Sequence, residues 1–385
     1  SMAQEYITGA LKEVNVGRQY PSYFAGRTGV YIVAAQIAKF QGNTDNVNAY
    51  LGQVRNVFED VQNAINTNSS SSKMYGLDMT DGCIMTGLGG LLYSGMLVNE
   101  YFGANTVNHG YIANLTYYLI AIGQDLASQF NEDFLVYKFN YDSSCFLPGS
   151  AEGNGGVIKM MMEAYSRGYV PELFSNDAYK VPIQNTLNWF LSIQLADGNI
   201  PTYSSNEDAT CGSVYGNDSD ARVQWCHGAP GFIDTLSLAA VVFDGIGDDT
   251  SAEKYLNAAL RAFNSTWERG LLIKGLMHCH GIGGNTYTLL HIYKNLLIIS
   301  QRNSILNVKY NVDFLMKQSM WRAIQFVKFT VSEQNLNVLR TEYSNMDYSF
   351  WLGSYGIPVL YIQAIQAGWP QSEPVCMIAY DFCGV

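Results

Sequence analysis

Pairs of glycines three residues apart recur along the 385-residue chain, and a strongly apolar segment of helical length follows each pair. The interval between successive pairs has room for two helices and their connections. Glycine has no side chain, so it lets chain ends crowd together where a helix starts. The pattern predicts a series of helical hairpins, with pairs that begin at Gly26, Gly87, Gly153, Gly228, Gly281 and Gly353.

Two kinds of helix alternate in this pattern. Segments after the glycine pairs are apolar nearly all round, which requires burial on every side. Segments between them, such as residues 44–65 and 251–270, carry apolar residues at three-and-four spacing, as helices with one exposed face do. The sequence therefore predicts an all-α fold of two concentric helix layers, arranged as a ring of hairpins, with residues 1–385 forming a single domain.

Composition and charge restrict the function classes. Only 14 % of the residues are charged and the net charge is −11, without a run of basic residues, which argues against a nucleic-acid partner. No apolar stretch is long enough to span a membrane, and we expect no secretion signal. The cysteines are odd in number and widely spaced, as reduced thiols are. We expect a monomeric, cytoplasmic protein.

Two copies of the pattern place a cysteine beside a histidine directly before the glycines. They read QWCHGAPG over residues 224–231 and KGLMHCHGIGGN over residues 274–285. Thiolate and neutral imidazole are the ligands that zinc prefers, and three protein ligands leave a fourth position for reaction. Buried cysteines and histidines also occur as ordinary core residues, and neither segment has the spacing of a CxxC motif. Spacing alone leaves zinc binding and core packing both open.

The succession of WCHGAPG and KGxxxCHGxxGN resembles the lanthionine synthetase C-like proteins of eukaryotes. The resemblance implies an (α/α) toroid of six or seven hairpins, with one zinc ion held by Cys226, Cys279 and His280. It also implies that a thiol adds to dehydroalanine or dehydrobutyrine residues. Thiol chemistry agrees, because a free thiol has a pKa of about 8.5 and coordination to zinc removes its proton.

Eukaryotic members of this family add glutathione to dehydrated residues in proteins, and the chain resembles that group. Lys274 is similar to the lysine that contacts glutathione there, and Arg340 and Thr341 resemble the Arg-Thr that precedes the last glycine pair. The resemblance implies that these residues bind the substrate, and cationic side chains suit the carboxylates of glutathione. A solvated surface charge is the alternative interpretation of Lys274 and of Arg340. The partners implied are glutathione or a similar thiol, together with dehydrated proteins or peptides.

Proton delivery is where the chain departs from the family. Addition of a thiol creates an enolate that needs a proton from a general acid. Glu152 stands where the family has a histidine; a carboxyl with a raised pKa could donate the proton, or the exchange could abolish activity. Arg222 and His227 are the other predicted catalytic residues. Their alternatives are an ion pair with Asp218 or Asp220 for Arg222, and support of the zinc ligand for His227.

The sequence supports an enzyme and a binding protein as alternatives. As an enzyme, the chain would transfer glutathione or another small thiol to dehydroamino acid residues, forming a carbon–sulfur bond. As a scaffold or signalling protein, it would bind zinc and glutathione without a proton donor at position 152. A glycosidase with paired carboxylates, another activity of helical toroids, is disfavoured because such enzymes need no thiolate ligands.

Overall fold

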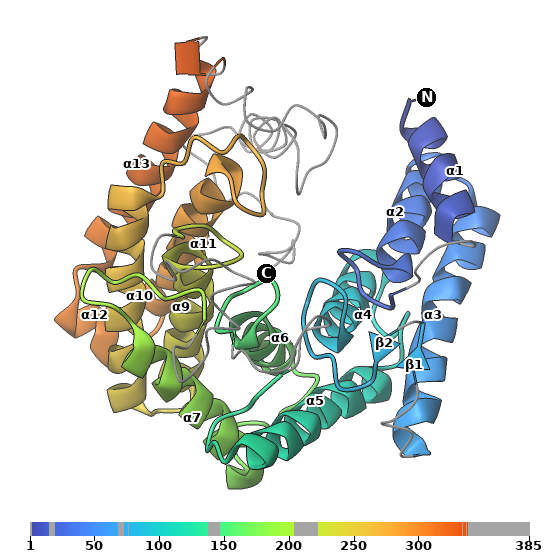
Figure 1. Ribbon diagram of the computed structural model, residues 1–385, viewed down its shortest axis with the longest axis horizontal. Coiled ribbons are helices and arrows are strands. Elements are labelled where there is room, and N and C mark those ends of the chain that lie inside the picture. Colours follow the sequence, from blue (N-terminus) through green and yellow to red (C-terminus); the bar gives the residue numbers. More distant parts are fainter. Residues whose placement is uncertain are drawn as a thin grey trace. The chain divides into compact units, whose positions relative to one another are not determined.

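Helices make up nearly all of the described chain. The computed structural model describes residues 2–14, 20–67, 73–75, 77–137, 147–203, 222–332, 334–335 and 337. Within these ranges one short antiparallel ladder pairs β1 (Lys73–Met74) with β2 (Leu77–Asp78). The helices in Figure 1 are α1 (Met2–Val14), α2 (Arg27–Phe40), α3 (Thr44–Asn66), α4 (Leu88–Phe102), α5 (His109–Phe130), α6 (Asn154–Ser166), α7 (Asp177–Ile193), α9 (Ala229–Gly245), α10 (Asp249–Arg269), α11 (Ile282–Ser300), α12 (Ile305–Lys309) and α13 (Val312–Val331). The all-α class is confirmed.

The predicted helix starts coincide with the glycine pairs. The first glycine of each described pair is the N-cap of a helix, in α2, α4, α6, α9 and α11. The pair at Gly353 lies outside the described residues. The partner helices α3, α5, α10 and α13 are instead capped by an asparagine or aspartate whose side chain accepts a backbone N–H bond. The two kinds of helix are therefore distinguished at their first residue.

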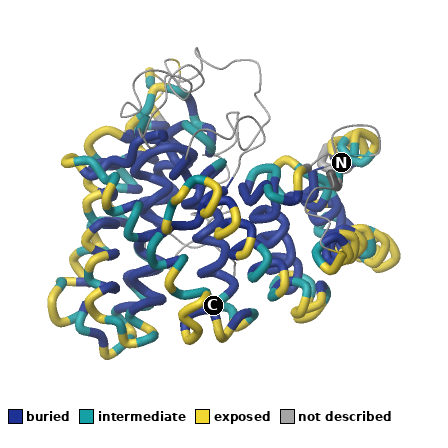
Figure 2. Tube along the Cα trace, turned by 60° about the horizontal axis from the view of Figure 1, so that its bottom comes forward, coloured by how far each residue is buried: buried dark blue, intermediate teal, exposed yellow. Residues whose placement is uncertain are grey.

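The two kinds of helix also differ in burial, as predicted. Every residue of α9 from Ala229 to Phe243 is buried, and α4 and α6 are buried along most of their length. Helices α3 and α10 bury one face and expose the other. The contrast is visible in Figure 2, where some helices are continuously buried and others alternate between buried and exposed positions. Helix α2 departs furthest from this pattern among the glycine-capped helices, because Val33 in its interior is exposed as well as Phe40 at its end, whereas α4 exposes Tyr101 only in its last turn.

Helices pack as consecutive hairpins within each of two compact units. The first unit comprises residues 1–146 and 152–186, and the second comprises 147–151 and 187–385. In the first, α2 packs on α3 and α4 on α5; in the second, α9 packs on α10 and α11, and α11 on α13 (Figure 1). Helix α5, which starts beside Gly110, buries one face only, so this segment is the partner of α4.

The glycines are required by the loop that precedes each buried helix. A Cβ at the second glycine of a pair would collide with the carbonyl oxygen of the residue six positions earlier, as at Gly284 with His278 and at Gly90 with Ile84. The first glycine meets its own sixth predecessor in the same way, as at Gly281 with Gly275. The glycines are therefore crowded chiefly by the loop of their own chain, which folds back over the first helical turn, and less by the ends of other helices.

One hydrogen bond closes this folded-back loop. The first helical N–H donates to the carbonyl seven residues earlier, from Leu88 to Asp81 at 3.0 Å and from Ile282 to Gly275 at 3.0 Å. The bond satisfies one of the N–H groups that a helix start leaves without a partner in the helix. The loops before α4 and α11 are thus held in shape by their own backbone. Among the described helices, none combines the length and apolarity that a membrane span requires.

Candidate metal centre

Two of these folded-back loops lie side by side in the second unit and carry the two predicted cysteine ligands. Cys226 stands two residues before the first glycine of α9, and Cys279 stands two residues before that of α11. The Cys226 N–H donates to the Cys279 carbonyl at 3.1 Å, and the Ser150 N–H donates to the Cys226 carbonyl at 3.1 Å. Because α9 and α11 also pack together, the two loops are held in register.

Cys226, Cys279 and His280 come together as the sequence predicted. Their two sulfur atoms and an imidazole nitrogen all lie within 4.8 Å of one another. Cys226 is buried, whereas Cys279 and His280 are half-buried. Two thiols and one imidazole form a donor set suited to zinc, with room in a tetrahedral site for one further ligand. The cluster could therefore hold a metal ion.

The surroundings of Cys226 favour its thiolate. Burial by itself raises the pKa of this thiol, but a hydrogen bond with Cys279 and the charge of His227 oppose that effect. Together with His280 they hold the pKa of Cys226 well below its ordinary value. A thiolate is the form that binds metals. The polypeptide therefore already stabilises the protonation state that metal binding needs.

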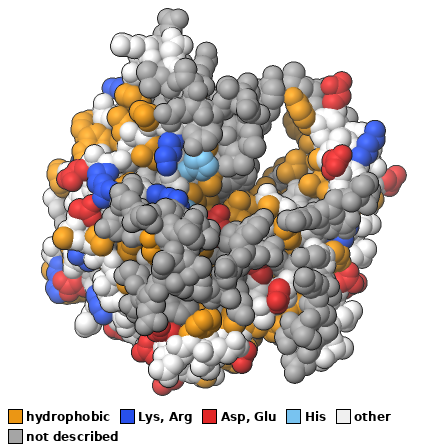
Figure 3. Space-filling view, in the orientation of Figure 1, with side chains coloured by type: hydrophobic (Ala, Val, Ile, Leu, Met, Phe, Trp, Pro, Cys, Tyr) orange, Lys and Arg blue, Asp and Glu red, His pale blue; other side chains and the backbone are white. Residues whose placement is uncertain are grey.

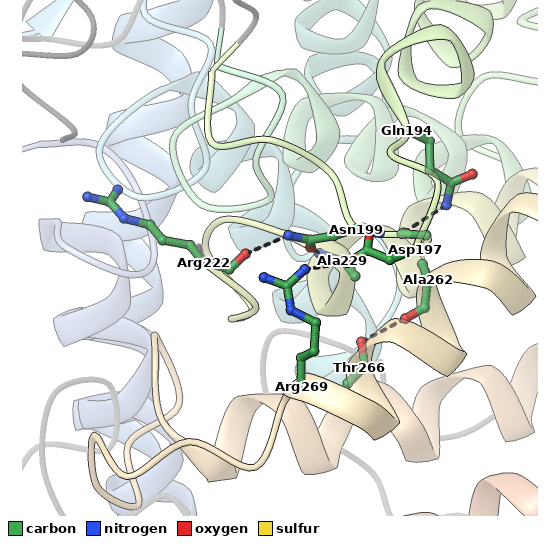
Figure 4. A network of polar contacts seen from close by, with 9 residues as sticks. Gln194, Asp197, Asn199, Arg222, Ala229, Ala262, Thr266 and Arg269 are labelled. Carbon is green, nitrogen blue, oxygen red and sulfur yellow. Dashed lines mark hydrogen bonds and ion pairs between the residues drawn. The ribbon is translucent and has the colours of Figure 1, made fainter. Parts of the chain in front are cut away.

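Asn199 anchors the loop that carries Cys226. Its side-chain Nδ2 donates to the Arg222 carbonyl at 3.1 Å, and its Oδ1 accepts from the Ala229 N–H at 2.7 Å. In the α4 and α11 loops the corresponding N–H and carbonyl bond each other directly. The buried amide of Asn199 is thus inserted where the α4 and α11 loops close on themselves (Figure 4). The Arg222 side chain extends away from these contacts.

Neighbouring contacts fix the same loop from both sides. Asn285 Nδ2 donates to the Val223 carbonyl at 2.9 Å and to the Gly270 carbonyl at 2.8 Å. The rings of Trp225 and His278 meet edge to face with centroids 5.0 Å apart. Trp225 and His278 are both buried, and each directly precedes one of the two cysteines. The ligand loops are therefore packed on the core of the second unit rather than left in solvent.

Gln224 joins Lys274 to the cysteine cluster. Lys274 Nζ donates to Gln224 Oε1 at 3.0 Å, and Gln224 Nε2 donates to Cys226 Sγ at 3.1 Å. Sequence reasoning missed Gln224 because a carboxamide is not a zinc ligand and its cationic partner is distant in the sequence. Lys274 is half-buried, so it is not a fully solvated surface charge.

The remaining predicted site residues are distributed as follows. His227 is buried beside Cys226, where its charge lowers the pKa of the thiol. Glu152 is half-buried and directly precedes the N-cap of α6, in the first unit. Arg340 and Thr341 lie outside the described residues.

On the described part of the face drawn in Figure 3, acidic and basic side chains are interspersed, and a histidine reaches the surface beside basic side chains.

A second buried thiol lies before α4 in the first unit. Asp81 Oδ1 accepts the Cys83 N–H at 2.9 Å, and Asp81 Oδ2 accepts the Thr86 hydroxyl at 3.1 Å. Burial raises the pKa of Asp81 to about 6, although these hydrogen bonds oppose the rise. Burial and the Asp81 charge also raise the pKa of the Cys83 thiol. This turn is therefore a poor place for a reactive thiolate.

Fold and centre together define an all-helical protein of glycine-capped hairpins with a Cys–Cys–His cluster at the entry of two buried helices. The family model described as "Lanthionine synthetase C-like protein" matches residues 1–357. The chain therefore belongs to the lanthionine synthetase C-like family.

Individual relatives are distant. The chain is 28 % identical over 214 residues to "Glutathione S-transferase LANCL1" of Danio rerio, a match that covers 55 % of this chain and 46 % of the relative. It is 25 % identical over 284 residues to "LanC-like protein GCL1" of Arabidopsis thaliana, covering 73 % of this chain and 57 % of the relative. The matches thus span about half the length of these relatives. Among solved structures, "Nisin cyclase" aligns with 94 % of this chain and 98 % of its own, at 18 % identity and a TM-score of 0.43.

Proposed function

We propose that the protein is a zinc-dependent enzyme that adds glutathione, or a similar small thiol, to dehydroalanine or dehydrobutyrine residues of proteins or peptides. The observation that carries the proposal is the cluster of Cys226, Cys279 and His280 in a chain of the lanthionine synthetase C-like family. The name of the Danio rerio relative, a glutathione S-transferase, supports glutathione as the thiol. A reducing compartment such as the cytoplasm would suit this chemistry.

The cluster fits zinc in the kind and number of its donors. Zinc bound by these residues would supply the positive charge that keeps a thiol deprotonated at neutral pH. Lys274 would attract a carboxylate of glutathione and so orient the tripeptide. In the reaction, the sulfur electron pair forms a bond to the β-carbon of the dehydroamino acid, while the π electrons move toward its carbonyl. A proton then has to reach the α-carbon.

Glu152, His227 and Arg222 are the proposed sources of that proton, in this order. Glu152 occupies the sequence position of the family histidine, directly before a glycine-capped helix. His227 is buried next to the Cys226 ligand. General acid catalysis contributes roughly 10² to 10⁴ in rate. If Glu152 cannot replace the histidine as proton donor, the second candidate function applies, in which the protein binds zinc and glutathione as a scaffold without catalysing the addition.

The test uses zinc-loaded protein, glutathione and a dehydroalanine peptide, with the thioether product measured by mass spectrometry. We expect turnover by the wild type and a loss of roughly 10² to 10⁴ in Glu152→Gln, with unchanged glutathione affinity by calorimetry. The exposed Glu172→Gln is the matched control and should keep full activity. Full activity in Glu152→Gln would show that Glu152 is not the proton donor and would leave His227 and Arg222 as the candidates. A wild type that binds zinc and glutathione without turnover would establish the scaffold.

A further inference from the structure

Gln224 is a buried residue that donates a hydrogen bond to the sulfur of one of the three cluster residues, Cys226. Gln224 is 6 % exposed, and both ends of its carboxamide are engaged. Lys274 Nζ lies 3.0 Å from Oε1, and Cys226 Sγ lies 3.1 Å from Nε2. Cys226 follows Gln224 by two residues in the same loop, whereas Lys274 comes from the loop before α11. The contact links both ligand loops through side chains.

The chemistry of Lys274 fixes which way the amide faces. An ammonium group has only donors, so it must meet the carbonyl oxygen of Gln224. The NH₂ group is then directed to the Cys226 sulfur and can only donate to it. A thiolate accepts such a bond more strongly than a thiol does, because its full negative charge assists the bond. The charge of Lys274 also polarises the amide and makes its N–H a better donor.

We infer that Gln224, polarised by Lys274, is a positioning residue that keeps Cys226 a metal ligand and prevents it from acting as a nucleophile. The inference rests on the proposed function, in which the thiol of the substrate reacts while the two cysteine ligands do not. A hydrogen bond to sulfur withdraws electron density and lowers the reactivity of that sulfur toward electrophiles. Dehydroalanine is such an electrophile, so an unprotected Cys226 would compete with the substrate thiol.

Alkylation of the zinc-loaded protein tests this without any turnover. Iodoacetamide is added, and peptide mass spectrometry gives the alkylation rate of Cys226 relative to Cys279 in the same molecules. Gln224→Met keeps the length of the side chain but removes the donor, and should raise this ratio on the order of tenfold, the factor that corresponds to a hydrogen bond to a charged group. Gln62→Met is the matched control, because Gln62 is also 6 % exposed and bonds Asn66 instead of sulfur.

Two further variants and one spectroscopic measurement make the conclusion independent of whether a single variant folds. Gln224→Glu replaces the NH₂ group by an oxygen and should raise the ratio as well, and Lys274→Met should raise it less, because the amide remains. In the cobalt-substituted protein, loss of the bond should shift the sulfur-to-cobalt absorption band to longer wavelength. An unchanged ratio and band in folded, metal-loaded Gln224→Met or Gln224→Glu would overturn the inference. If the wild type shows no turnover but Cys226 still reacts faster with iodoacetamide in the Gln224 variants, the inference holds and the proposed enzymatic function is wrong.

Discussion

Cys226 and Cys83 are both buried thiols, yet their surroundings shift their pKa in opposite directions. Burial and the neighbouring Asp81 carboxylate raise the pKa of Cys83, so it stays a neutral core residue. Around Cys226 burial has the same effect, but Cys279, His227 and His280 outweigh it and lower the pKa. Burial by itself therefore does not decide the chemistry of a cysteine; the charges and donors within hydrogen-bond reach do.

Replacement of one ligand should cost metal and stability together. In Cys279→Ala the cluster loses one of its two sulfur donors, so we expect less than one zinc per chain by metal analysis and a lower melting temperature. Cys83→Ala is the matched control, since it removes a buried thiol outside the cluster and should leave the zinc content unchanged. Full zinc and an unchanged melting temperature in Cys279→Ala would show that the cluster is not the metal site.

Asp81 should make the stability of the protein depend on pH. Its pKa is about 6 in the folded chain against 3.8 for an ordinary aspartate, so the folded state holds a proton that the unfolded state has released. The protonated Asp81 therefore contributes fully to the free energy of unfolding below pH 3.8, and this contribution is lost as the pH rises from 3.8 through about 6. Urea unfolding between pH 4 and pH 7 should show a smaller decline for Asp81→Asn than for wild type. Parallel curves would exclude a raised Asp81 pKa.

At the scale of single elements, the folded-back loop makes particular glycines irreplaceable. A methyl group at Gly284 would meet the His278 carbonyl, which belongs to the same loop as Cys279. Such overpacking costs about 1–3 kcal/mol of unfolding free energy. Gly52, in the interior of α3, is the contrasting position, because a Cβ there has only the Arg55 guanidinium nearby, at 3.9 Å.

We therefore expect opposite effects from two glycine-to-alanine replacements. Gly284→Ala should lower the free energy of unfolding by about 1–3 kcal/mol and reduce metal affinity. Gly52→Ala should raise it by about 0.5–1 kcal/mol, because alanine is the better helix former. Chemical unfolding and metal titration of both variants provide the measurement. A Gly284→Ala variant as stable as Gly52→Ala would contradict the folded-back geometry.

Glycine spacing and apolar periodicity were sufficient to predict where α4, α6, α9 and α11 begin, because both signals are local in the sequence. The Cys–Cys–His cluster was predictable only through the resemblance to the family, because the spacing of the cysteines and histidines left zinc binding and core packing both open. Asn199 and Gln224 were not, since their importance arises from partners on other loops, at Arg222 and Lys274. The exposure of α2 was missed for a similar reason: apolar composition indicates that a helix can be buried, while its neighbours decide whether it is.

At the scale of the whole molecule, the centre belongs to one of the two compact units. Cys226, Cys279, His280 and the Gln224–Lys274 pair all lie in the second unit, while α2 to α6 lie in the first. A bound metal would stabilise the structures that hold its ligands. Whether the chain behaves as the single domain predicted from its sequence is therefore testable through the metal.

Hydrogen exchange before and after chelation should locate that stabilisation. We expect removal of the metal to speed amide exchange at the starts of α9 and α11, with little change in α4, because local openings are confined to the region that loses its contacts. Cys279→Ala, treated with the same chelator, controls for effects of the chelator itself. Equal loss of protection in α4 would mean that both units unfold together, as one cooperative domain.

The folded-back loop also separates what the scaffold needs from what the chemistry needs. The close contacts that shape it involve two glycines and backbone carbonyls, so the fold-back itself does not prescribe which side chains stand at the two positions directly before the first glycine. These positions hold Phe24 and Ala25, Met85 and Thr86, Ala151 and Glu152, Cys226 and His227, and Cys279 and His280. A lineage of such proteins can thus gain, lose or relocate a reactive group by exchanging one or two codons, while every helix stays where it was.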